Sequence, residues 1–241
     1  MFKNNLKKLS KRKIQDDFMT LSSHQLRTPL SGIKWLLELL QKSDAGNFSK
    51  KQRDYLEKIN FSNERMIALV NDLLEVSRID QGEQKLYLQP TDLVMVIRGL
   101  IKDKQKQIAQ KKLQVTFVTE QEPFPFVITE VNKIKQALGN LLSNAITYTN
   151  PGGKIGIDVK VKDKHVLGTI SDTGVGIPKN EQKHIFDKFF RGTNVLSFES
   201  TGTGLGLFIT RSFIEGSGGK IWFDSKLGEG TTFYFTLPIA K

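Results

Sequence analysis

Apolar residues recur at steps of four and three along two stretches near the start of the chain, and this spacing constrains the fold most strongly. In the first stretch, residues 14–42, the seam consists of Ile14, Phe18, Leu21, Leu26, Leu30, Ile33, Leu37 and Leu40, with one step of five before Leu26. In the second, the seam consists of Tyr55, Ile59, Ser62, Met66, Leu69, Leu73 and Val76. Such steps place side chains on one face of a helix. Two helices joined by a polar turn at residues 43–47, with Asn47 or Ser49 as cap of the second, predict a helical hairpin.

Further apolar residues lie off these two seams, which bears on the oligomeric state. They are Leu36, Leu56, Phe61, Val70 and Leu74. A second copy of the hairpin would cover them by completing a four-helix bundle, so the sequence predicts a homodimer. The alternative is a hairpin that docks on the remainder of its own chain.

Composition limits the remaining choices. The 241 residues leave room for two domains, and no apolar run approaches the ~20 residues of a membrane-spanning helix. There is no signal-peptide pattern. Because there is no cysteine, disulfides, thiolate metal sites and a cysteine nucleophile are excluded, and a cytoplasmic location is expected.

The formal net charge of +11 raises the question of a nucleic-acid partner. The basic residues are not interleaved with aromatic residues on one element, so no nucleic-acid binding is expected. The densest basic run lies in residues 1–13. A segment just inside a membrane-anchored sensor region would have this composition, and so would a solvated helix end.

After residue 81 the helical spacing stops, and residues 82–241 have the pattern of an α/β domain. Strands are expected at 86–89, 113–120, 154–162, 165–172, 220–225 and 231–237. Helices are expected after Thr91 and Thr129 as caps, up to about residues 111 and 148, and at 181–186 and 204–216. Five or so strands with helices on one face make an α/β sandwich. The chain is thus divided into a basic segment 1–13, a hairpin 14–81 and a domain 82–241.

The hairpin contains the segment Ser-His-Gln-Leu-Arg-Thr-Pro-Leu at residues 23–30, with one of only three histidines in the chain, His24. The step of five in the seam falls beside it, and Pro29 cannot donate a helical hydrogen bond, so the helix is expected to bend there. A neutral imidazole nitrogen is a competent nucleophile near neutral pH. A lone histidine on a helix is usually a solvated surface residue, so its role depends on the second domain.

Two asparagines stand one helical turn apart in the helix that ends near residue 148. Asn140 and Asn144 share one face of an otherwise apolar helix. Two amides there are costly unless they meet a ligand, and a carboxamide oxygen suits Mg²⁺ carried by nucleotide phosphates. Helix capping or internal amide bonding is the alternative explanation.

Two glycine-rich segments and a tight turn complete the set of polar features. Asp172 ends a strand and is followed by Gly174 and Gly176, so its carboxylate can accept a bond from an exocyclic amine while the glycines admit a flat ring. Residues 202–207 precede a helix whose first amides can bind phosphate oxygens. Residues 228–233 form a turn into the last strand, for which a simple hairpin turn is the alternative.

Taken together and in this order, these segments resemble the sensor histidine kinases of two-component signalling, from about residue 18 to 238. Residues 23–30 resemble the phosphoacceptor box of that family. The second domain resembles its ATPase domain, a fold shared with DNA gyrase, mismatch-repair ATPases and heat-shock chaperones. Residues 185–191 (Ile-Phe-Asp-Lys-Phe-Phe-Arg) resemble the F box, which lies between the two glycine-rich boxes. A polar stretch after it, 193–202, has the length of a lid.

The resemblance implies a kinase that uses ATP and Mg²⁺, phosphorylates His24 and passes the phosphoryl group to an aspartate of a response-regulator receiver domain. It implies that Asn144 ligates Mg²⁺, Asp172 reads adenine and Tyr148 lines the base pocket. The implied catalytic residues are His24, Gln25, Thr28 and Asn140. The implied nucleotide-binding residues are Asn140, Asn144, Tyr148, Asp172, Gly174, Gly176, Gly202, Gly204, Leu205, Gly206, Leu207 and Thr232.

Three positions depart from the family pattern. Gln25 replaces an acid that is thought to accept the imidazole proton, and a glutamine cannot act as a base. Thr147 stands where Lys or Arg is common, for which Lys183, Lys188 and Arg191 are candidate substitutes, and Ser217 replaces a common histidine. Because Thr28 resembles the residue that orients water for dephosphorylation, a kinase-weak phosphatase of the regulator, or a nucleotide-gated scaffold, is the alternative function. An ATPase clamp of the same fold is a further rival.

Overall fold

The computed structural model describes residues 26, 28–40, 48–195 and 202–240. It divides the chain into two units, Met1–Gln84 and Lys85–Lys241, and each is described by itself. The predicted segment 1–13, the predicted turn at 43–47 and residues 196–201 of the predicted lid lie outside the described residues.

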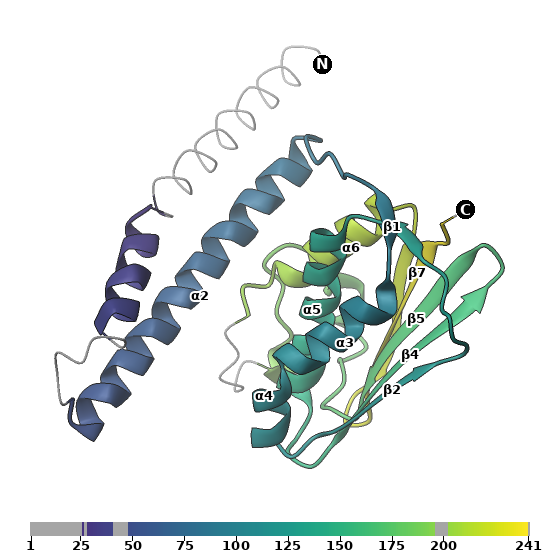
Figure 1. The fold of residues 1–241 in the computed structure, drawn as a ribbon. Coiled ribbons are helices and arrows are strands. Elements are labelled where there is room, and N and C mark those ends of the chain that lie inside the picture. Colours follow the sequence, from purple (N-terminus) through teal and green to yellow (C-terminus); the bar gives the residue numbers. More distant parts are fainter. Residues whose placement is uncertain (1–25, 27, 41–47, 196–201, 241) are drawn as a thin grey trace, which may run out of the picture. The chain divides into compact units, whose positions relative to one another are not determined.

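The first unit contains a helical hairpin (Figure 1). Residues 28–40 are helical, and α2 (Lys50–Asp80) forms the second arm. Ser49 caps α2 with a capping box, because its hydroxyl accepts the N–H of Gln52 at 3.3 Å and its own N–H donates to Oε1 of Gln52 at 2.8 Å. The cap predicted at Asn47 or Ser49 is therefore Ser49.

The two arms of the hairpin meet through a small apolar cluster. Leu30, Val70 and Leu74 are its buried members, and Ile67 packs against them. Beside it, the side-chain amide of buried Asn63 donates to the carbonyl of Leu30 at 3.0 Å. An exposed ion pair, Lys34 to Glu64 at 2.8 Å, also joins the arms, but at the surface it adds little stability.

The structure corrects the predicted packing face of the second helix. Val70 and Leu74, predicted to lie off the seam, are the residues that meet the first arm. Most of the predicted seam is exposed instead, with relative accessibilities of 51% at Tyr55, 49% at Ile59 and 45% at Met66, although its last residue, Val76, is buried. The reason is that α2 carries two apolar stripes and the hairpin covers only one of them. Other large apolar side chains exposed on the hairpin are Leu26, Ile33, Trp35, Leu36, Leu39, Leu40, Phe61 and Leu69.

The second unit is built on a five-stranded sheet with strand order β2-β4-β5-β7-β6. Its strands are β2 (Gln114–Thr119), β4 (Lys154–Lys162), β5 (His165–Asp172), β6 (Lys220–Lys226) and β7 (Gly230–Pro238). β2 pairs with β4 in parallel, and the other neighbours are antiparallel. Because β5 and β7 are adjacent, the loop after one and the turn before the other meet at the same edge.

Helices cover one face of this sheet (Figure 1). They are α3 (Leu93–Asp103), α5 (Val131–Tyr148) and α6 (Gly206–Gly216), with a short α4 (Gln105–Gln110) after α3. Alternate residues of β4, β5 and β7 are buried, as expected of strands covered on one side. The layered arrangement confirms the predicted α/β sandwich. Two single-turn 3₁₀ helices, η1 (Gln182–His184) and η2 (Thr193–Val195), lie between β5 and α6.

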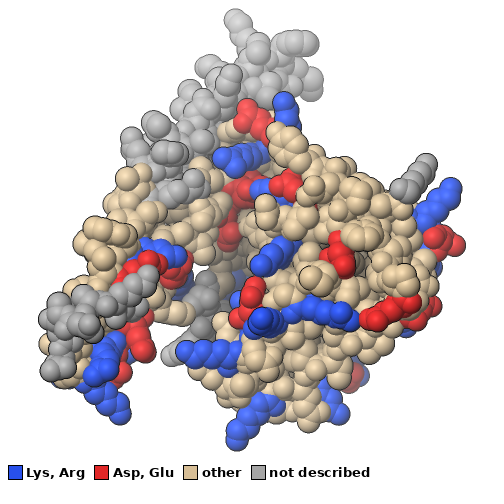
Figure 2. Space-filling model, in the orientation of Figure 1, with Lys and Arg blue, Asp and Glu red and all other residues tan. Residues whose placement is uncertain are grey.

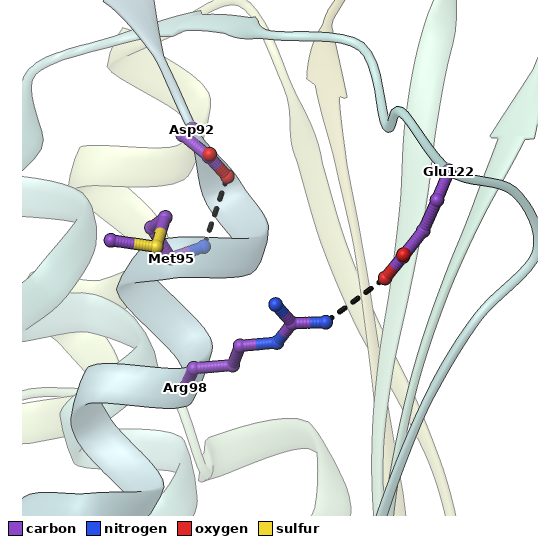
Figure 3. Close-up of polar contacts among 4 residues, drawn as sticks. All are labelled: Asp92, Met95, Arg98 and Glu122. Carbon is purple, nitrogen blue, oxygen red and sulfur yellow. Dashed lines mark hydrogen bonds and ion pairs between the residues drawn. The ribbon is translucent and has the colours of Figure 1, made fainter.

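Two predicted helix caps are wrong, because both threonines belong to strands. Thr91 ends β1 (Gln89–Thr91), and Thr129 ends β3 (Val127–Thr129), with which β1 pairs. β1 also begins later than the strand predicted at 86–89. The cap of α3 is Asp92, whose Oδ1 accepts the N–H of Met95 at 2.9 Å (Figure 3). A β-branched threonine suits a strand, whereas the carboxylate one residue later suits a cap.

Positively and negatively charged side chains are interspersed on the face drawn in Figure 2. Some form ion pairs between elements, as Figure 3 illustrates for Arg98 of α3 and Glu122 after β2, whose nearest atoms are 3.0 Å apart. Within the described residues, no helix has the length and apolar character needed to cross a membrane.

Candidate nucleotide-binding site

The side chain of Asn140 joins α5 to the start of α6. Its Nδ2 donates to the carbonyl of Gly206 at 3.2 Å and lies 3.5 Å from the hydroxyl oxygen of Thr210. Asn144, one turn later on α5, is half-buried, and its carboxamide bonds to none of the other described residues. The two predicted asparagines therefore differ: Asn140 joins two helices, whereas the carboxamide of Asn144 makes no such bond, and its role as a ligand of Mg²⁺ stays a prediction.

Asp172 stands at the end of β5, and its carboxylate is held by two main-chain groups. Oδ1 accepts the N–H of Gly174 at 2.8 Å and the N–H of Thr231 at 3.3 Å. Burial raises the pKa of this carboxyl above its ordinary value, and the two N–H groups oppose the shift. Both bonds end on Oδ1, so Oδ2 remains an acceptor for a donor such as an exocyclic amine.

The threonine that lies beside Asp172 is Thr231, whereas Thr232 was predicted as a nucleotide-binding residue. Thr231 lies directly opposite Asp172 in the ladder between β5 and β7, and opposite residues point to the same face. Thr232 pairs with Ser171 and Asp224 instead, so its side chain points to the other face. Two adjacent threonines in a sequence do not reveal which one shares a face with Asp172.

Gly174 and Gly176 bring the loop after β5 close to neighbouring main chains. A Cβ on Gly174 would lie 2.5 Å from the carbonyl oxygen of Tyr148. Gly176 has a φ of +66°, and a Cβ there would overlap the last carbonyl of β6. Between them, Val175 accepts the N–H of Gly228 at 2.8 Å. The loop is therefore clamped between the end of α5 and the β6–β7 turn, which requires glycine at both positions.

Tyr148, the last residue of α5, touches both glycine-rich loops. Its carbonyl accepts the N–H of Val175 at 3.2 Å. Its hydroxyl oxygen lies 3.9 Å from the position that a Cβ on Gly202 would occupy. Tyr148 is half-buried and lies beside the loop that follows Asp172, and its role in lining the base stays a prediction.

The second glycine-rich loop, residues 202–207, is fixed just before α6. Gly204 has a φ of +73°, and a Cβ there would come within 2.6 Å of the main-chain carbonyl carbon of Phe189. Leu205 is fully buried and donates its N–H to the hydroxyl of Thr203 at 3.2 Å. The loop is thus held by an apolar anchor and by contact with the F-box segment.

α6 begins at Gly206 and is 11 residues long. The N–H groups of its first turn, including that of Leu207, have no partner within the helix, and the dipole favours an anion there. Phe208 lies in the same turn, and Nζ of Lys188 is 4.8 Å from the centre of its ring. Of the three candidates to replace the charge missing at Thr147, Lys188 is therefore placed beside this helix start.

The F-box segment packs with apolar and aromatic contacts. Ile185 is buried, and the Phe186 ring lies 6.0 Å from that of Phe223, edge to face. The guanidinium carbon of Arg211 on α6 also lies over the Phe186 ring, 5.6 Å from its centroid. These contacts tie the segment to both β6 and α6.

Sequence reasoning missed Glu181, which organises the segment before residue 196. Its buried carboxylate accepts the hydroxyl of Thr193 at 2.6 Å and the N–H of the same residue at 3.1 Å. The next residue, Asn194, donates its amide to the carbonyl of Gly176 at 2.9 Å. In the sequence, Glu181 is simply an acidic residue shortly after Pro178. Acidic residues in loops are usually exposed to solvent, so nothing marked this one as buried.

The histidine segment lies at the edge of the described part of the chain. His24 and Gln25 lie outside it. Thr28 is exposed at the start of the helical residues 28–40, so its side chain is open to a partner or to water.

Comparisons with known proteins match both units. The His Kinase A (phospho-acceptor) domain matches residues 14–82, and the histidine kinase-, DNA gyrase B- and HSP90-like ATPase matches residues 129–241. The catalytic domain of the histidine kinase ThkA is 32% identical; 95% of it is covered by 63% of this chain, with a TM-score of 0.56. This chain belongs to the sensor histidine kinases.

Two further relatives resemble this histidine kinase over almost its whole length. The sensor histidine kinase WalK of Bacillus subtilis is 36% identical over 225 residues, which are 92% of this chain and 36% of WalK. Full-length ShkA in complex with AMPPNP is 26% identical and superposes with a TM-score of 0.75, covering 93% of this chain and 46% of ShkA. The chain spans about a third of the length of the first curated relatives that it matches.

Proposed function

We propose that this chain is an ATP-dependent protein-histidine kinase that phosphorylates its own His24 and passes the phosphoryl group to an aspartate of a response-regulator receiver domain. The observation that carries the proposal is that one chain contains both a phosphoacceptor domain and an ATPase domain. A phosphoacceptor domain with His24 is followed by an ATPase domain in which Asp172, Tyr148 and both glycine-rich loops converge. ShkA, a relative with the same two-part fold, was crystallised with an ATP analogue.

The adenine end of the nucleotide is assigned to the edge of the sheet where β5 ends. Oδ2 of Asp172 accepts the exocyclic amine of the base, while Oδ1 stays bonded to Gly174 and Thr231. Tyr148 lines the base from the side of α5. Since the carboxylate is held by main-chain groups, little conformational freedom is lost when the base binds.

The phosphate end is assigned to the first turn of α6 and to Lys188, which combine helix N–H groups with a cation. Asn144, with a carboxamide that bonds to none of the other described residues, offers the hard oxygen that Mg²⁺ accepts. When bound, the ion neutralises charge on the phosphate oxygens. Asn140 supports this arrangement by keeping α5 and α6 in register.

Phosphorylation requires a neutral imidazole nitrogen of His24 to attack the γ-phosphorus in line with the leaving oxygen of ADP. A nitrogen–phosphorus bond forms, the bond to the β-phosphate oxygen breaks, and the imidazole loses a proton. Since Gln25 cannot take that proton, it passes to water. The rate then depends chiefly on positioning and on charge neutralisation by the nucleotide site.

We also infer that the hairpin forms a homodimer. One apolar stripe of α2 is covered by the first arm, whereas Tyr55, Ile59, Met66 and Leu69 remain exposed. A second hairpin would cover this stripe as a four-helix bundle does. Sedimentation of the chain and of a Met66→Glu, Leu69→Glu double variant tests this; a wild-type monomer would contradict the inference.

Transfer to a receiver domain tests the function beyond the first phosphorylation. The chain is labelled with γ-labelled ATP, freed of nucleotide and mixed with purified receiver domains. The label is expected to move to one receiver domain and to stay on the kinase when the acceptor aspartate of that domain is replaced by alanine. Retention of the label with every receiver domain encoded by the same genome would contradict the proposed transfer.

A further inference from the structure

Lys111 follows α4, and its side chain binds the end of α5. Nζ donates to the main-chain carbonyls of Ile146 at 2.9 Å, Thr147 at 2.7 Å and Thr149 at 3.1 Å. An ammonium group has three N–H donors, so these bonds use all of them. The carbonyls lie at the negative end of the helix dipole, where a cation is stabilising.

Tyr148 is the one residue of this run whose carbonyl Lys111 does not bind. That carbonyl accepts the N–H of Val175 instead, at 3.2 Å. All four consecutive carbonyls from Ile146 to Thr149 are therefore engaged. Lys111 holds the peptide groups on either side of Tyr148, and the remaining one carries the loop that follows Asp172.

The main chain of Lys111 contributes to the same arrangement. Its carbonyl accepts the N–H of Gly152 at 2.9 Å, in the turn that leads from α5 into β4. Nearby, Gln114 donates its N–H to the carbonyl of Gly153 at 2.9 Å. The side chain and the main chain of Lys111 thus together hold the segment from Ile146 to Gly152, which includes Tyr148.

The last carbonyls of a helix are often hydrogen-bonded by water. Capping them with a lysine instead costs free energy, because the charged ammonium group is partly desolvated. Lys111 is half-buried, and burial lowers its pKa below the ordinary value. The neighbouring Lys112 is exposed and makes no comparable contact. This desolvation cost indicates that the position of the end of α5 is important for the site beside it.

We propose that Lys111 is a positioning residue for the adenine side of the nucleotide site, acting through the main chain of Tyr148 and Val175. This inference rests on the proposed function, since it assumes that Asp172 and Tyr148 receive adenine. On the phosphate side, the first turn of α6 and Lys188 lie outside the segment that Lys111 binds, and Asn144 precedes the bound carbonyls on α5. Loss of the lysine should therefore weaken recognition of the base more than recognition of the phosphates.

The test compares the affinities of ADP and GDP for the wild type, Lys111→Met, Lys111→Arg and the matched control Lys112→Met, by calorimetry with Mg²⁺. GDP shares the phosphates but carries a carbonyl oxygen at C6, where adenine carries the exocyclic amine that Asp172 is proposed to accept. In Lys111→Met we expect ADP affinity to fall about tenfold and GDP affinity to change less than threefold. Lys111→Arg should recover most of the ADP affinity, and Lys112→Met should resemble the wild type.

The outcomes separate this inference from the proposed function. If the wild type binds ADP and Lys111→Met binds it equally well, the inference is overturned. An equal loss of ADP and GDP affinity also overturns it, because that is what general destabilisation would produce. A wild type that binds neither nucleotide overturns the proposed function itself. Should Lys111→Met fail to fold, Lys111→Gln, which keeps an amide donor, is judged by the same comparison.

Discussion

Asp172 and Thr231 lie directly opposite each other in the ladder between β5 and β7, and the N–H of Thr231 donates to Oδ1 of Asp172 at 3.3 Å. The neighbouring N–H of Gly174 binds the same oxygen at 2.8 Å. The carboxylate is therefore fixed by the loop after β5 and by β7, with Oδ2 still open. Under the proposed function, this open oxygen accepts the exocyclic amine of adenine.

Replacing Asp172 with Asn should weaken ADP binding about tenfold or more. The substitution removes the charge from the proposed bond to the adenine amine, and hydrogen bonds to charged groups are worth about 1.5–3 kcal/mol. Calorimetric titration with ADP measures the effect. Asp224→Asn is the control, because Asp224 is exposed on β6 and pairs with Thr232 on the other face. Unchanged affinity in Asp172→Asn would remove this residue from the site.

The pH dependence of binding should have a definite sign. Since burial raises the pKa of Asp172, ADP affinity should fall as the pH is lowered through that raised pKa and the acceptor becomes protonated. Folding stability should respond in the opposite direction: the native state binds this proton more tightly than the unfolded chain, so protonation favours folding. Asp172→Asn should lose both pH dependences. The measurements are the ADP affinity by calorimetry and the free energy of unfolding in urea, each compared between variant and wild type over a range of pH. A difference that does not vary with pH would contradict the assignment.

Gly176→Ala should abolish measurable nucleotide binding, whereas Gly228→Ala should be tolerated better. Both glycines have positive φ values, +66° and +80°, which cost a non-glycine residue about 1–2 kcal/mol. Only at Gly176 would the added Cβ also overlap a main-chain carbonyl, while at Gly228 it would meet open space. Thermal unfolding and ADP titration of both variants check this. Equal behaviour of the two would show that the clamp around Val175 is unimportant.

Gln25→Glu should raise the initial rate of autophosphorylation about tenfold or more. The carboxylate would accept the imidazole proton, and general base catalysis typically contributes at least that much. The initial rate of label incorporation at saturating ATP is the measurement, with Gln25→Ala as the control that changes the side chain without adding a base. If the rate with glutamate equals the rate with glutamine, the missing base does not limit this kinase.

Some of this architecture was readable from the sequence because the local pattern determines it. The alternation in residues 154–162 and 165–172 predicted β4 and β5 at the bounds observed. The glycines of both loops were also identified, since close approach and positive φ leave few other residue types possible. The strand end at Asp172 was predicted for the same reason, because it precedes such a loop, and the role of Asp172 in binding adenine stays a prediction.

What could not be predicted depended on contacts between distant residues. The spacing on α2 did not show which of its two apolar stripes would meet the first arm, so Val70 and Leu74 were assigned to the wrong side. The choice between Thr231 and Thr232 depended on strand register. Glu181 and Lys111 stand out only through bonds to Thr193 and to the end of α5. No local pattern marks such residues.

Labelling with γ-labelled ATP and Mg²⁺ tests the central claim most directly. Wild type and His24→Ala are incubated side by side, and the label is examined for stability in acid and alkali. The account predicts an acid-labile, alkali-stable label on the wild type and none on the variant, while both still bind ADP. Equal labelling of the two proteins, or no label on a wild type that binds ATP, would contradict it.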